Sequence, residues 1–145
     1  MNKFWGHLKT ITHHRHLVMR GCFRMGLIWQ GLTHDLSKYS PTEFLAGVRY
    51  YQGDRSPNTA EREANGYSLA WMHHKGRNRH HFEYLTDLSP KTRTYEPVDM
   101  PVRYLCEMVA DRIAACKTYQ GAAYTDASPL QYLDRANESR LVHPQ

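Results

Sequence analysis

The sequence predicts an all-α protein, and three observations support this fold class. Apolar residues recur at steps of three and four along most of the 145 residues, as in helices that bury one face. Residues 40–43 (Ser-Pro-Thr-Glu) and 128–131 (Ser-Pro-Leu-Gln) have the form of a capping box with proline at the first helical position. No segment combines strand alternation with hairpin turn signals. We therefore expect a compact single-domain bundle of about five to six helices.

The N-terminal half is expected to hold the first helices. Residues 4–29 have a helical apolar pattern that predicts one long helix or two, because glycines interrupt it at places where a helix can bend or stop. The next helix should begin at the first capping box and run to Tyr51. A further helix is expected over residues 59–74, because Gly76 soon follows and can end it.

The C-terminal half is expected to hold a short helix, a loop and two longer helices. Residues 80–85 would form the short helix, and residues 86–99, which are polar and contain two prolines, a long surface loop. Residues 102–119 carry a clear apolar stripe and predict a strong helix. Residues 126–145 would form a last helix, ending near Arg140, and a tail.

Length and composition indicate a soluble cytoplasmic protein with one domain over residues 1–145. The three cysteines are odd in number and widely separated, which argues against a disulfide framework and fits a reducing cytosol. No run approaches the roughly 18 apolar residues that span a bilayer, and the N-terminus lacks the apolar region of a signal peptide. We therefore expect no membrane partner.

The net charge of +5 is spread along the chain. Basic residues are mixed with acidic ones and form no Lys/Arg tract, which argues against a dedicated nucleic-acid role. A basic protein is compatible with a small anionic, phosphorylated substrate. The composition leaves the oligomeric state open, and a homo-oligomer is compatible with it.

The most informative segment is residues 33–38, Thr-His-Asp-Leu-Ser-Lys, because it joins an imidazole, a carboxylate and an ammonium group. Imidazole and carboxylate are the usual ligands of divalent transition metals, and an aspartate can bridge two ions. In the predicted first helix, His14 shares a helical face with Val18, one turn later, and is therefore expected to point inward. The residues that could form a first metal position are His14, His34, Asp35 and Asp111.

A second metal position would use Asp35 again, together with histidines from two pairs, each made of two neighbouring residues. The pairs are residues 73–74 and 80–81, and a turn between them would let histidines of both pairs approach the same ion. The sequence does not decide which member of each pair turns inward. The ligands named for this position are His74 and His81, with His73 and His80 as alternates.

The order His, His-Asp, His, His, Asp on a helical chain resembles the HD-domain superfamily of metal-dependent phosphohydrolases. Several segments also look like an uncharacterised bacterial and phage family of HD-like proteins, over roughly residues 8–120: residues 11–14, 34–44, 71–74, 78–84 and 107–111. The resemblance implies an HD-like helical bundle, the metal ligands named above and a Lys38 that faces the anionic group of the substrate.

The resulting functional expectation is hydrolysis of a phosphate ester or nucleotide, with one or two divalent transition metal ions (Fe, Mn, Co, Zn or Ni) as cofactor. Catalytic roles are expected for Asp35 and Lys38, and for Glu107, which could orient a histidine ligand. The residues expected to bind substrate are Lys38, Arg77, Asn78 and Arg79. Two alternatives stay open: a non-haem di-iron redox or oxygenase-type HD protein, and a non-catalytic protein whose metal only stabilises the fold.

Overall fold

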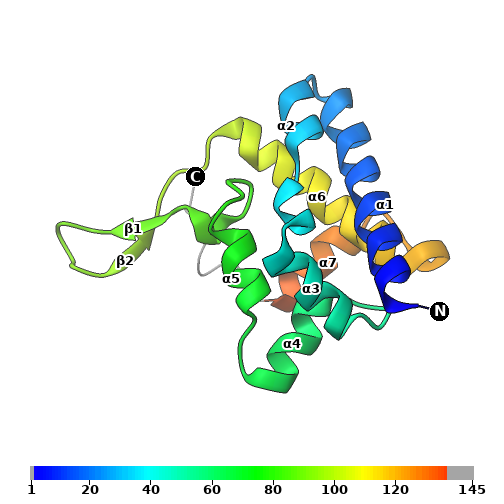
Figure 1. Cartoon of the computed structure of the whole chain (residues 1–145). Coiled ribbons are helices and arrows are strands. Elements are labelled where there is room, and N and C mark those ends of the chain that lie inside the picture. The colour runs from blue at the N-terminus through cyan, green and yellow to red at the C-terminus, as the bar shows by residue number, and fades with distance from the viewer. Residues whose placement is uncertain (1, 137–145) are drawn as a thin grey trace.

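The longest helix, α1 (Lys3–Arg24), lies along α6 (Val102–Gln120), and these two helices enclose the apolar core (Figure 1). Val18 and Cys22 of α1 are fully buried against Ala110 and Ala114 of α6. The two backbones approach closely, because a β-carbon at Gly21 would lie 3.1 Å from Cβ of Ala110. Small residues at the crossing therefore fix the distance between the two helices that carry part of the site.

The computed structural model describes residues 2–136, which are mostly helical and contain seven α-helices. Besides α1 and α6, these are α2 (Ile28–Thr33), α3 (Pro41–Tyr50), α4 (Pro57–Asn65), α5 (Leu69–Lys75) and α7 (Ser128–Ala136). Three short 3-10 helices are η1 (Leu36–Tyr39), η2 (Phe82–Tyr84) and η3 (Gly121–Ala123). The predicted helical fold is confirmed over this part of the chain. The expected helix end near Arg140 and the tail lie outside the described residues.

Two of the expected helices are divided, the first as the sequence had left open and the second unexpectedly, which raises the number of α-helices in the described residues above five to six. The first breaks at Gly26, whose φ of 73° is left-handed, so that α1 ends and α2 begins around it. The expected helix over residues 59–74 breaks at Gly66, with a φ of 82°. Ser68 then caps α5 by accepting a hydrogen bond from the amide of Trp71 at 2.9 Å.

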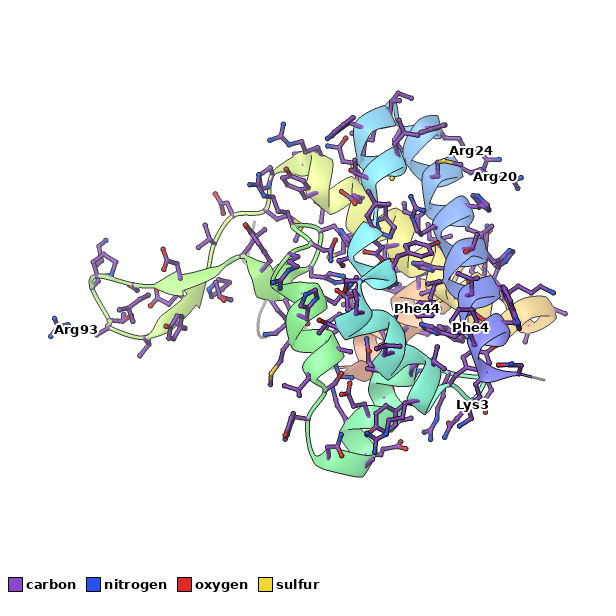
Figure 2. All side chains as sticks on the ribbon, in the orientation of Figure 1. Lys3, Phe4, Arg20, Arg24, Phe44 and Arg93 are labelled. Atoms are coloured by element: carbon purple, nitrogen blue, oxygen red, sulfur yellow. The ribbon has the colours of Figure 1, made fainter. Side chains whose placement is uncertain are left out.

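The loop expected over residues 86–99 is wrong in part, because it forms a β-hairpin. β1 (Thr86–Leu88) pairs antiparallel with β2 (Tyr95–Pro97). Figure 1 shows the hairpin projecting from the helical body, and Figure 2 shows Arg93 at its tip, away from the rest of the chain. The short helix expected over residues 80–85 is also reduced to η2, and the two histidines before it lie in a turn. Among the described residues, no helix is both long and apolar enough to cross a membrane.

A buried carboxylate joins α4 to α5, the helix that presents one of the histidine pairs. Glu61 accepts hydrogen bonds from the hydroxyl of Ser68 at 2.5 Å and from the amide of Ala70 at 3.4 Å. Glu61 is only 5% exposed and both donor residues are buried as well, so loss of the carboxylate leaves buried donors without their acceptor. The contact therefore fixes where α5 begins relative to α4.

Glu61→Ala is expected to lower the free energy of unfolding by about 1–3 kcal/mol, since two buried donors lose their acceptor. Urea unfolding measures this change. Glu63→Ala on the same helix is the matched control, because the Glu63–Arg55 ion pair is exposed and should contribute less than about 1 kcal/mol. Equal losses in both variants would contradict the structural role of Glu61.

Candidate metal centre

Asp35 lies at the centre of the site, in the turn between α2 and η1. Its φ of 52° and ψ of 28° are left-handed, a conformation that aspartate tolerates better than most residues. The side chain is fully buried. Arg15 of α1 holds this turn, because its guanidinium donates to the carbonyl oxygens of Leu32 at 3.0 Å and His34 at 2.8 Å. The local backbone therefore turns the Asp35 carboxylate inward.

One oxygen of Asp35 faces three side chains that come from α1, the end of α2, and α6. Oδ2 lies 3.2 Å from Nε2 of His34 and 3.8 Å from Nε2 of His14. Oδ1 of Asp111 lies 2.9 Å from the His14 nitrogen and 3.4 Å from the His34 nitrogen. One ligand atom from each of these four residues lies within 4.8 Å of the others. The structure thus brings together the four residues expected for the first metal position.

The other oxygen of Asp35 faces the histidine pairs. Oδ1 lies 3.3 Å from Nε2 of His74 and 3.4 Å from Nε2 of His80. The Nε2 atom of His81 lies 2.9 Å from that of His74. Both members of the 80–81 pair therefore join this group, because they lie in a turn and not on one helix face. His73, by contrast, contacts Glu43 through Nδ1 at 2.7 Å.

Several buried ligand atoms of the two groups make no hydrogen bond of good geometry with a described residue, although they lie close to charged groups, and Oδ2 of Asp35 forms an ion pair with Lys38. These atoms are Nε2 of His14, His34 and His80, and both carboxylate oxygens of Asp35. Buried polar atoms are normally hydrogen-bonded, so several such atoms converging on one place require an explanation. All five are of the types that bind divalent transition metals. The side chains fit one ion on each side of Asp35.

The two aspartates of the centre carry the negative charge that a metal ligand needs. Burial acts to raise the pKa of Asp35, but His34 and Lys38 outweigh it and hold this pKa well below its usual range. Burial likewise opposes ionisation of Asp111, whereas the adjacent His14 and His34 imidazoles keep its pKa well below its usual range. Both carboxylates are therefore anionic at neutral pH. Lys38 carries the opposite charge, with Nζ 2.6 Å from Oδ2 of Asp35.

Glu107 of α6 supports a histidine on each side of Asp35. Its Oε1 atom lies 2.9 Å from Nδ1 of His34 and 3.2 Å from Nδ1 of His80. A carboxylate that accepts from Nδ1–H fixes the tautomer in which Nε2 presents its lone pair. The structure places Glu107 behind two histidines, where the sequence suggested that it could orient one.

Glu43 supports the site in the same way but was missed in the sequence. Its two oxygens lie 2.7 Å from Nδ1 of His73 and 2.8 Å from Nδ1 of His74. The capping-box pattern accounted for Glu43 as a local helix-start residue, and Ser40 indeed accepts a hydrogen bond from its amide at 3.5 Å. Its side chain instead turns inward and is 6% exposed.

A cavity of about 370 Å³ opens beside the two groups. Lys38 lines it, and so do the side chains of His14, His74, His81 and Asp111. The remaining lining includes apolar and aromatic residues from several helices: Ile11, Trp71, Phe82, Met108 and Tyr119. The cavity therefore connects the proposed ion positions to a space with the size of a small-molecule site.

The three other residues expected to bind substrate do not line this cavity. Arg77, Asn78 and Arg79 line a second, smaller hollow of about 260 Å³. Asn78 donates to the carbonyl oxygen of His74 at 2.8 Å, so it supports the turn that follows α5. Arg79 donates to the hydroxyl of Tyr104 at 3.3 Å. These three side chains thus line a different hollow from Lys38, and this hollow also reaches His34 and His80 of the candidate centre.

His7 is a further buried histidine that the sequence interpretation did not select. It lies on α1, two helical turns before His14, and lines the cavity at 6% exposure. Burial, with a smaller contribution from Lys38, lowers the pKa of His7 to about 4, so the ring is neutral at physiological pH. The spacing of seven to His14, with Ile11 between them, was the available signal, because these residues share one helix face.

Residues 3–145 match a protein family described as "Family of unknown function (DUF5662)". The expectation of an uncharacterised family is confirmed, whereas nothing in this match relates the chain to the HD-domain superfamily. No curated protein and no solved structure matches the chain.

Proposed function

We propose that this chain, which belongs to the DUF5662 family of unknown function, is a metal-dependent phosphohydrolase of HD type that acts on a small phosphate ester or nucleotide. The observation that carries the proposal is the position of Asp35. Each of its two buried oxygens faces a separate group of histidine and carboxylate ligand atoms, beside a cavity. A carboxylate in this position can bridge two ions.

The imidazole and carboxylate groups around Asp35 are ligands for divalent ions, and such ions would supply the chemistry of the centre. When bound, divalent ions supply Lewis acidity that polarises a phosphoryl oxygen and lowers the pKa of water at the site. His14, His34 and Asp111 would hold the first ion with Asp35, and His74, His80 and His81 would hold the second. Glu43 keeps His74, and Glu107 keeps His34 and His80, in the ligating tautomer.

Lys38 supplies the positive charge that a phosphoryl group needs. Its side chain is 25% exposed and lines the cavity, so that it can face both Asp35 and a substrate. Burial alone would lower the pKa of Lys38, but Asp35 and Asp111 raise it above its usual value and keep the ammonium charged. A fixed cation beside the reacting group stabilises the negative charge that develops in the transition state.

The experiment is metal analysis of the purified protein, followed by a screen of phosphate monoesters and nucleotides with manganese, cobalt, iron, zinc and nickel. Lys38→Gln is expected to retain the metal, because it replaces none of the ligand atoms, but to lose about a hundredfold or more of kcat, because it removes a charge that stabilises the transition state. Lys91→Gln, on the exposed hairpin, is the control and should match the wild type.

Three outcomes would contradict the proposal in different ways. Unchanged turnover in Lys38→Gln would exclude the role of Lys38. Bound metal without hydrolysis of any ester would argue for a structural metal. A tightly held iron pair with oxygen-sensitive colour would favour the redox alternative.

A further inference from the structure

The cavity extends beyond the metal ligands to a region between α1 and α3. Figure 2 shows the side chains of Phe4 and Phe44 close together there, and their ring centroids are 5.1 Å apart. The His7 ring lies beside Phe44, with a centroid distance of 5.3 Å, and beside Tyr51 at 5.9 Å. The rings of Phe44 and Tyr51 thus pack against His7, and of these aromatic side chains His7 is the one that lines the cavity.

His7 is held rigidly in this position. A β-carbon at Gly47 of α3 would overlap Nε2 of His7, so the imidazole packs directly on the α3 backbone. The opposite ring nitrogen, Nδ1, is buried and makes no hydrogen bond with any described residue. The ring therefore has one edge fixed by packing and a polar atom that lacks a partner.

The hydroxyl groups next to His7 are already paired. Thr10 donates its only proton to the carbonyl oxygen of Gly6 at 3.0 Å. Since the Thr10 and Tyr51 hydroxyl oxygens are also 3.0 Å apart, Tyr51 must donate to Thr10. Neither hydroxyl has a proton left for a ligand, so that His7 is the hydrogen-bond donor that α1 offers at this end of the cavity.

We propose that His7 is a specificity-determining residue, which binds an uncharged hydroxyl or carbonyl group on the organic part of the substrate. This inference rests on the proposed function, because it assumes that the phosphate group lies at Lys38 and the metal ligands. A neutral imidazole in an aromatic environment suits an uncharged polar partner. A cavity of about 370 Å³ lies near the lower end of the usual range for small-molecule sites, about 300–1,000 Å³, and so favours a small ester.

The test compares two kinds of substrate in the manganese-loaded protein. Phenyl phosphate has no polar group outside its phosphate, whereas sugar and nucleoside monophosphates do. In His7→Leu, the preference for the best sugar or nucleoside ester over phenyl phosphate, measured as a ratio of kcat/KM values, should fall about tenfold, as expected for one lost hydrogen bond. The loss should appear mainly in KM.

Further variants separate recognition from folding. His7→Asn places an amide near the position of Nδ1 and should restore part of the preference. His16→Leu, an exposed histidine on the same helix, should leave it unchanged. Metal content should equal that of the wild type in all three variants. An unchanged preference in His7→Leu, or no difference between the leucine and asparagine variants, would overturn the inference.

Binding measurements keep this inference separate from the proposed function. If no ester is hydrolysed, calorimetry with the same esters on the manganese-loaded protein still tests His7. Binding that depends on His7 without turnover would contradict the phosphohydrolase proposal only. Turnover of sugar or nucleoside esters that does not depend on His7 would contradict the specificity role only.

Discussion

Asp35→Asn is expected to abolish stable metal binding at both positions and to reduce hydrolysis to background. Each Asp35 oxygen faces a different group of ligands, so one substitution removes a negative ligand from both ions. We expect the metal affinity to fall by more than about a hundredfold, the upper range for loss of a residue that only supports a ligand. Elemental analysis after dialysis and the hydrolysis assay measure the two effects.

The asparagine variant is a better test than Asp35→Ala. Asparagine has nearly the same shape as aspartate and tolerates the left-handed φ of 52° that this position requires. Alanine would add backbone strain and an internal cavity to the loss of the ligand. Asp87→Asn, on the exposed hairpin, is the control for loss of one carboxylate. If Asp35→Asn retains one ion at wild-type affinity, Asp35 does not bridge.

The helical fold could be predicted because its signals are local. Apolar periodicity located the helix that became α6, and the first capping box located α3, which begins at Pro41. The break at Gly66 was not recognised, because the helical pattern continues on both sides of that glycine. The hairpin was not predicted because its strands have three residues each, too few to show an alternation of apolar and polar residues.

The two sides of the candidate site differ in how far they could be predicted. His14 has an assignable face because it lies within a regular helix, so its inward direction follows from the apolar stripe. His80 and His81 lie in a turn, where no periodicity relates sequence position to direction. Glu43 and Glu107 are fixed by contacts with residues far away in the sequence, which spacing along one element does not reveal.

The carboxylates of Glu107 and Glu43 contact different numbers of proposed ligand histidines, and this difference predicts different effects on the two ions. Glu107 contacts His34 on one side of Asp35 and His80 on the other. Glu43 contacts His74 on one side only, and its second partner, His73, lies outside both groups. We therefore expect Glu107→Gln to weaken both ion positions by about 10- to 100-fold, and Glu43→Gln to weaken one position by a similar factor.

Metal titration by calorimetry against a competing chelator distinguishes the two patterns. Glutamine preserves side-chain volume, and thermal unfolding of the metal-free variants checks that the fold is intact. In Glu43→Gln, one binding step should keep its wild-type affinity while the other weakens. In Glu107→Gln, both steps should weaken, because one carboxylate oxygen orients a ligand of each ion. A Glu107→Gln variant in which a single step weakens would show that the two positions are supported independently.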